Sequence, residues 1–185
     1  MKCIRRRVMN CMAAAALVGA MSGANAAGSL WNYSVHMDVT INRPAKDVWP
    51  YFVGDKKDQW AGLKGEPIKY TTIAGEPGKV GEVYTHSFLY QGYHLYYEAI
   101  AISQDSEIVL KITYNKNEKD PRRLAGYDLI SLSEAGGRTR IDFHQAFALP
   151  VQAAKGDLAS LSKVHNQELT DAFQELKRTV ENGGQ

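Results

Sequence analysis

The chain changes from strand to helix within residues 35–53, VHMDVTINRPAKDVWPYFV. Apolar and polar side chains alternate over residues 35–41, which is typical of a strand with one buried face. Pro44 then suits the first turn of a helix. The buried stripe of that helix would consist of Val48, Trp49, Phe52 and Val53. Pro50 should keep the helix short or bend it.

A run of strands is predicted beyond this point. A second short helix is expected around residues 58–60, a strand over 68–73, and a glycine- and proline-rich connection over 75–81. Apolar alternation and turn residues then predict strands over residues 83–90, 94–102, 108–114, 127–132 and 140–147. Residues 115–124 carry charges of both signs and are expected to form a solvated loop. Successive strands of this kind favour antiparallel pairing.

The last segment has a helical pattern. From residue 157 to 181 apolar side chains recur at helical spacing, at Leu158, Leu161, Leu169, Ala172, Phe173, Leu176 and Val180. Asp157 is a plausible N-cap, and Gly183 with Gly184 a stop. The element order predicts an α+β domain in which this long helix buries its stripe on a curved antiparallel sheet.

This order of elements resembles the helix-grip fold of the START-like, or SRPBCC, superfamily, which includes polyketide cyclase/dehydrase and lipid-transport proteins. Four stretches carry the resemblance: residues 41–49 (INRPAKDVW), residues 78–83 (GKVGEV), the strand pair around Tyr97 and Glu98, and residues 137–143 (GRTRIDF). The resemblance covers the chain from about residue 34 to 181.

The resemblance implies a cavity between the sheet and the long helix, where members of the superfamily hold lipids, sterols, polyketides and other apolar or aromatic molecules. It does not imply one activity, because many members bind or carry ligands and only some catalyse a reaction. It supplies no universal catalytic motif.

The N-terminus has the three parts of a secretory signal peptide: a basic stretch, an apolar run over residues 12–21, and the small-x-small site Ala24-Asn25-Ala26. We expect cleavage after Ala26, then a flexible tail over residues 27–33 and the helix-grip domain over 34–182. Cleavage would remove four basic and no acidic residues and both cysteines, leaving 159 residues with 18 basic and 20 acidic side chains, a net charge of −2. A periplasmic or secreted protein without stable membrane insertion is therefore expected.

The expected cavity residues come from strand and helix facing. His86 has the best-placed inward imidazole, and His86, Glu98 and Tyr96 are candidates for acid–base catalysis. Glu98 and Asp128 each share a strand face with apolar residues, and a carboxylate buried there would need a partner or a raised pKa. A solvent-facing position is an equal alternative for both. The predicted ligand-binding set is Tyr84, His86, Phe88, Tyr90, Tyr96, Ile112, Tyr114, Ile130, Phe143, Gln145, His165 and Leu169. Asp142 and His144 are expected on the opposite, exposed face.

Several functions are disfavoured by the motifs and the charge. The mature chain lacks the basic surplus of a nucleic-acid binder. No spacing of histidines or cysteines indicates a metal site, and no glycine-rich loop indicates a nucleotide cofactor, so no metal and no cofactor are expected. The favoured function is an exported binding protein that encloses a hydrophobic or aromatic small molecule, such as a lipid, a sterol or a polyketide-like compound. The main alternative is a cofactor-independent cyclase or aromatase, and the third is a partner-binding protein with a collapsed cavity. The oligomeric state is not predicted.

Overall fold

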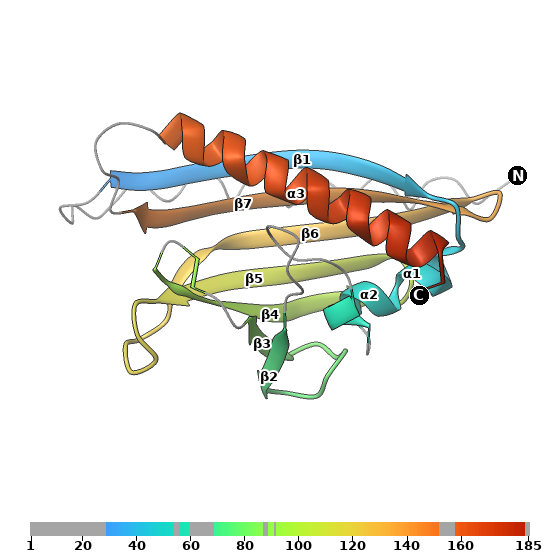
Figure 1. Cartoon of the computed structure of the whole chain (residues 1–185). Helices are drawn as coiled ribbons and strands as arrows, with labels where there is room; N and C mark the ends of the chain where they lie inside the picture. The colour runs from blue at the N-terminus through green and yellow to red at the C-terminus, as the bar shows by residue number, and fades with distance from the viewer. Residues whose placement is uncertain are drawn as a thin grey trace, which may run out of the picture.

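The computed structural model describes residues 29–53, 56–59, 69–86, 89–90, 92–151 and 158–183, and Figure 1 shows its arrangement. The described strands form one seven-stranded antiparallel sheet with the order β1-β7-β6-β5-β4-β3-β2. The long helix α3 lies across one face of this sheet (Figure 1). The predicted α+β architecture, with two short helices after the first strand, is confirmed.

The elements have the following bounds. The strands are β1 (Ser29–Ile41), β2 (Tyr70–Ala74), β3 (Val83–His86), β4 (His94–Ser103), β5 (Glu107–Asn115), β6 (Arg123–Ala135) and β7 (Arg138–Val151). The helices are α1 (Ala45–Val48), α2 (Pro50–Val53), the 3-10 turn η2 (Lys57–Gln59) and α3 (Leu158–Glu181).

The first strand is longer than the sequence predicts. β1 begins at Ser29, so the prediction of a flexible tail is wrong from that residue onward. Trp31 and Tyr33 continue the inward alternation and are buried. The Trp31 indole N–H donates to Ser162 Oγ over 2.9 Å, and the Tyr33 hydroxyl donates to Asn166 Oδ1. Both partners lie on α3, so the helix holds this end of the strand in place.

The remaining strands match the predicted order with different limits. The strand predicted over residues 83–90 ends at His86, and Tyr90 forms an isolated bridge with Tyr93 beyond it. β6 and β7 extend past the predicted limits at both ends. Next to the turn they pair with each other as far as Ala135 and Arg138, and their other ends pair with β5 and β1.

The sheet bends where its ladder is interrupted. The register shifts between Ala99 and Ala101 in β4 and between Ile112 and Thr113 in β5. Gly126 faces the second interruption, and a Cβ there would lie 1.9 Å from the carbonyl oxygen of Ala146. Bulges and interior glycines increase strand twist and allow close backbone approach, which curves the sheet around α3.

The two short helices are separated by proline, as predicted. Pro44 lies at the N-cap of α1 and not within its first turn. Pro50 begins α2, so neither helix exceeds four residues. Trp60, expected at the end of the next helical turn, lies outside the described residues, as do the signal-peptide segment, Asp157 and Gly184.

The long helix follows the predicted stripe. His165, Ala172, Phe173, Leu176 and Val180 are its buried residues, at intervals of one, three, four or seven positions. Its C-terminal end lies beside α1 (Figure 1), where the Asn42 N–H donates to Glu181 Oε1 over 2.8 Å. After the helix, Gly183 adopts a φ of 75°, a left-handed conformation that favours glycine.

The buried side chains form two clusters under α3. One surrounds the C-terminal half of the helix and includes residues of α1 and α2. The other includes Trp31, Tyr33, Tyr90 and Phe147 and packs against the N-terminal half of α3. Residues of both clusters line the same internal space, which therefore lies where the two meet.

Candidate functional site

A cavity of about 140 Å³ lies between the sheet and α3. One enclosed water needs only about 10–15 Å³ measured in this way, so the space exceeds a hydration site about tenfold. Its walls are mostly aromatic and aliphatic. The apolar lining includes Phe52, Leu95, Leu110, Ile112, Ala125, Ile130, Phe143, Phe147, Leu149, Leu169, Ala172 and Phe173.

Four of its polar side chains form a continuous hydrogen-bonded series, called here the polar chain. The Tyr90 hydroxyl lies 2.8 Å from His165 Nδ1, and His165 Nε2 lies 2.9 Å from Gln145 Oε1. The amide of Gln145 in turn donates to the carboxylate of Asp128. Since Gln145 Oε1 can only accept, His165 carries its proton on Nε2, and the Tyr90 hydroxyl donates to Nδ1.

His165 is electrically neutral in this environment. Its side chain is buried and contacts the rings of Trp31, Tyr33 and Phe147 edge to face. Burial lowers the pKa of His165 to about 4, because the imidazolium form loses its hydration. At neutral pH the ring therefore relays a hydrogen bond and carries no charge.

Asp128 is the most unusual polar group of the cavity. The residue is 5% exposed, and burial raises the pKa of its carboxyl to about 7, although the hydrogen bond from Gln145 acts in the opposite direction. Among the described residues, Asp128 Oδ1 is a buried side-chain oxygen that lacks a hydrogen-bond partner. Leaving a buried acceptor unpaired costs about 1–3 kcal/mol. A ligand that donates a hydrogen bond to this oxygen would recover that free energy.

Three tyrosines form a second wall near Asp128. Tyr84 stacks on Tyr97 with ring centroids 5.4 Å apart, and Tyr70 meets Tyr84 edge to face at the same distance. Burial, followed by the negative charges and phenols nearby, raises the pKa of all three phenols above the ordinary value. They are neutral hydrogen-bonding groups on a flat apolar surface, which suits an aromatic ligand.

Most of the predicted ligand-binding residues line the cavity. The structure brings together nine of the twelve, namely Tyr84, His86, Tyr90, Ile112, Ile130, Phe143, Gln145, His165 and Leu169. His86, the imidazole predicted to point inward, is buried beside Tyr97 with ring centroids 5.8 Å apart.

Tyr96 and Glu98 lie on the wrong side of β4 for a role in the cavity. The Tyr96 hydroxyl donates to Asn115 Oδ1 over 3.3 Å, and the Arg122 guanidinium lies 3.8 Å above its ring. Glu98 Oε2 accepts from Lys111 Nζ over 2.7 Å, with both side chains about one-third exposed. Alternation instead turns Leu95 and Tyr97 inward, so two of the three predicted acid–base candidates are misplaced.

Two other predicted residues do not contribute to the described lining. Tyr114 is buried but packs edge to face on Tyr93, with ring centroids 5.3 Å apart. Phe88 lies outside the described residues.

Some lining residues were missing from the predicted set. Tyr97 lies two residues from both Leu95 and Ala99 on β4, so strand alternation places it on the same inward face once those two residues are assigned there. Lys57 reaches the cavity from η2 and lies 4.3 Å above the Tyr84 ring, a contact that no local pattern signals. Asp128 is buried with a raised pKa, as expected for an inward carboxylate at that position.

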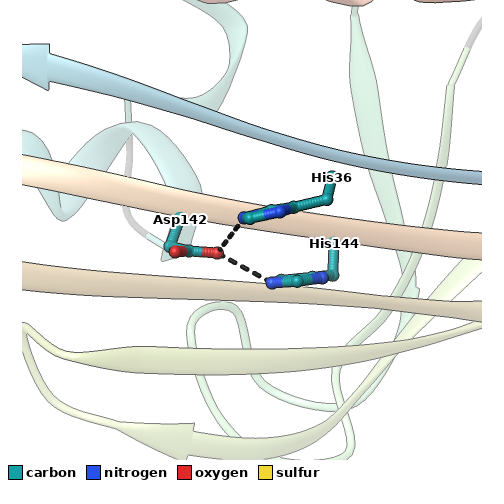
Figure 2. A group of neighbouring side chains, drawn as sticks. All are labelled: His36, Asp142 and His144. Carbon is teal, nitrogen blue, oxygen red and sulfur yellow. Dashed lines mark hydrogen bonds and ion pairs between the residues drawn. The ribbon is translucent and has the colours of Figure 1, made fainter. Parts of the chain in front are cut away.

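The opposite face of the sheet holds a polar cluster. Asp142 and His144 are exposed or half-exposed, as predicted, and His144 Nε2 lies 2.8 Å from Asp142 Oδ1. His36 joins them across β1 and β7, with its Nε2 3.0 Å from the same oxygen (Figure 2). The sequence has no closely spaced histidines, and strand register brings these residues together although they lie far apart in the sequence.

Comparison with known proteins finds likeness in structure only. No family model and no curated protein matches the chain. Protein CV1439 from Chromobacterium violaceum superposes with a TM-score of 0.58 at 13% identity, covering 80% of this chain and 96% of that one. A conserved protein from Geobacillus kaustophilus gives a TM-score of 0.60 at 12% identity, covering 81% and 96%. These likenesses establish the fold alone.

A third similar structure is DynU16, a protein of the dynemicin biosynthetic locus. Its TM-score is 0.54 at 15% identity over 81% of this chain. This chain spans about half of DynU16, 48% of its length.

Proposed function

We propose that this protein encloses one small aromatic molecule in the cavity and carries or sequesters it. The observation that carries the proposal is Asp128 Oδ1, an unpaired buried oxygen in a cavity whose walls are mostly aromatic and aliphatic. The ligand would place its ring among the aromatic walls and its hydroxyl or N–H group on Asp128. Placement of the chain in the START-like superfamily is part of the same proposal, which the cavity fold and the likeness to DynU16 support.

The size of the cavity favours a single ring over a lipid or sterol. An apolar cavity of about 150 Å³ admits benzene, and the present one has about 140 Å³. A sterol or a phospholipid chain would require the helix and sheet to separate. We therefore expect a monocyclic phenol or aromatic amine to bind without such a movement.

A matched pair of ligands tests the proposal. At pH 8, phenol should bind about 10- to 100-fold more tightly than toluene, since a hydrogen bond to a charged acceptor contributes about 1.5–3 kcal/mol. Asp128→Leu should remove this preference and leave toluene binding within a few-fold. Isothermal titration calorimetry measures both affinities.

Two controls make the result decisive. Glu98→Gln changes a carboxylate of the same sheet on its outer face and should leave both affinities unchanged. Asp128→Asn retains an acceptor and the side-chain shape, so it should keep part of the preference if Asp128→Leu folds poorly. Equal affinity for phenol and toluene in the unchanged protein, or no binding of either below about 1 mM, would refute the proposal.

A second function is favoured by the pKa of Asp128. A carboxyl group with a pKa of about 7 exists in both protonation states near neutral pH, which is what general acid–base catalysis requires. If the protein is an enzyme of this kind, a cofactor-independent cyclase or aromatase, Asp128 would be its acid–base group in place of Glu98 and Tyr96. Native mass spectrometry with organic extraction of protein from its own host separates the two: one unchanged compound supports a carrier, and a mixture of substrate and altered product supports an enzyme.

We further propose export to the periplasm or the exterior after cleavage behind Ala26. A basic stretch, an apolar run and a small-x-small site support it. Among the described residues, no helix combines the length and apolarity needed to cross a membrane.

The processing site is directly measurable. When the full chain is expressed in a bacterium, N-terminal sequencing of the exported form should begin at Ala27. Ala26→Leu should block processing and accumulate the precursor, because the cleavage site needs a small residue, whereas Ala13→Leu within the apolar run should be processed normally. Intact precursor as the sole form of the unchanged protein would contradict export.

A further inference from the structure

The outer face of β1 and β7 presents three metal-ligating side chains together (Figure 2). His36 pairs with His144 across the two strands, and Asp142 precedes His144 by two residues, so all three point to the same side. One ligand atom from each lies within 4.8 Å of the others. The two imidazoles are parallel, 7° apart in plane, with centroids 4.0 Å apart.

The present hydrogen bonds already hold the ligand atoms close to coordination spacing. Asp142 Oδ1 lies 3.0 Å from His36 Nε2 and 2.8 Å from His144 Nε2. Four-coordinate zinc with bonds of about 2.0–2.1 Å separates its ligand atoms by about 3.3 Å. Zinc binding would require these ligand atoms to move apart by a few tenths of an ångström and the stacked rings to rotate toward a common centre.

We propose that His36, Asp142 and His144 bind one divalent transition-metal ion of the zinc type on the outer face of the sheet. Two imidazoles and one carboxylate are the ligand set that such ions prefer over calcium or magnesium. The half-exposed side chains leave the remaining coordination position to water. The site is separate from the cavity, so this inference does not rest on the proposed function.

The proton balance of binding is simple. Each neutral imidazole now donates its Nε2 proton to Asp142, and the ion takes the place of both protons. The displaced proton moves to Nδ1 of the same ring, so a neutral imidazole releases no proton when the ion binds.

The charges around the cluster favour a single carboxylate oxygen as ligand. Arg140 Nη2 lies 3.8 Å from Asp142 Oδ2, and Arg140 Nε lies 3.6 Å from Asp38 Oδ2. Arg140 thus occupies the Oδ2 side and leaves Oδ1 directed at the histidines. Its positive charge also opposes the cation, so Arg140→Gln should strengthen binding or leave it unchanged.

The test is titration of tag-free, chelator-treated protein with Zn²⁺ by isothermal titration calorimetry. We expect one ion per chain. His36→Ala, Asp142→Asn and His144→Ala should each weaken binding at least tenfold, the lower end of the roughly 10- to 100-fold cost of losing even an outer-shell partner. His94→Ala, which removes a histidine outside the cluster, should have no effect.

A second readout separates binding from folding. Because the ion would join the first strand to the last, Zn²⁺ should raise the melting temperature of the unchanged protein and of His94→Ala but not of Asp142→Asn. The metal-free variants should melt near the unchanged protein, since the three side chains are exposed or half-exposed. Unchanged zinc affinity in His144→Ala, or no saturable binding in the unchanged protein, would overturn the proposal.

Discussion

Replacing Glu82 with alanine should cost about 3 to 5 kcal/mol of unfolding free energy, the loss that follows when one partner of a buried ion pair is removed. Glu82 is 1% exposed. Its carboxylate accepts from Lys57 Nζ over 2.7 Å, from Thr72 Oγ1 over 2.8 Å and from the Gly78 N–H over 2.7 Å. One side chain therefore connects η2, β2 and the turn before β3.

The alanine variant would leave the Lys57 ammonium group, 11% exposed, without its anion beside the cavity. Chemical denaturation measures the loss. Lys57→Met should also destabilise, since it leaves the buried carboxylate with neutral donors only. The double variant Glu82→Ala, Lys57→Met removes both members of the ion pair and should be less destabilised than the sum of the two single changes. Additive effects would contradict the ion-pair argument.

The same carboxylate makes the fold sensitive to acid. Burial raises its pKa, but hydrogen bonds from Lys57, Gly78 and Thr72 outweigh burial and hold the pKa of Glu82 below its ordinary value. The folded state therefore binds the proton less tightly than the unfolded state. The stabilisation is present above the unfolded pKa and is lost as pH falls through the lower folded value.

Asp128→Asn is expected to stabilise the protein at pH 8, by on the order of 4 kcal/mol, and to have almost no effect below pH 4. The folded pKa of about 7 lies above the ordinary 3.8. Between these values the unfolded chain ionises first, so stability falls as pH rises, and above pH 7 the full penalty of a buried carboxylate is present. Asparagine cannot ionise and avoids the penalty.

His165 should give the opposite slope over nearly the same range. Its folded pKa of about 4 lies below the ordinary 6.5, so the unfolded chain binds a proton first as pH falls from 6.5 to 4, and stability falls with it. Glu168 Oε2, 3.9 Å from His165 Nδ1, and the Tyr90 hydroxyl are polar groups that face the ring.

The two slopes should largely cancel in the unchanged protein. Urea unfolding from pH 5 to 8 should therefore show a flat profile below pH 6.5, a rising one for Asp128→Asn and a falling one for His165→Gln. Glu98→Gln, on the outer face, should run parallel to the unchanged protein. Parallel profiles for all four proteins would show that neither buried group titrates as described.

The sequence was sufficient to predict the fold because the fold depends on local periodicity. Alternation over residues 35–41 and the helical stripe of α3 both indicate burial on one face. Each pattern can be recognised without knowing which elements pack against it. Trp31 and Tyr33 were assigned to a tail because their burial comes from Ser162 and Asn166 on α3, contacts more than a hundred residues away.

The site was predictable where one strand face is clearly more apolar. Tyr84 and His86 lie on such a face of β3. On β4 the two faces are almost equally apolar, and Arg122, stacked on Tyr96 from outside the strand, covers the outer one. The pairing of His36 with His144 depends on register alone, which single-sequence patterns do not determine.

The pairing of β1 with β7 also determines when the fold can be completed. Ser29 lies opposite Val151, and Ile41 opposite Thr139, so the first strand finds its neighbour only at the far end of the chain. A chain that emerges from the ribosome or through a translocation channel with its N-terminus leading must keep β1 unpaired until residue 138 has followed. Contacts of such long sequence separation make folding slow. The topology therefore delays closure of the sheet until nearly the whole chain is free.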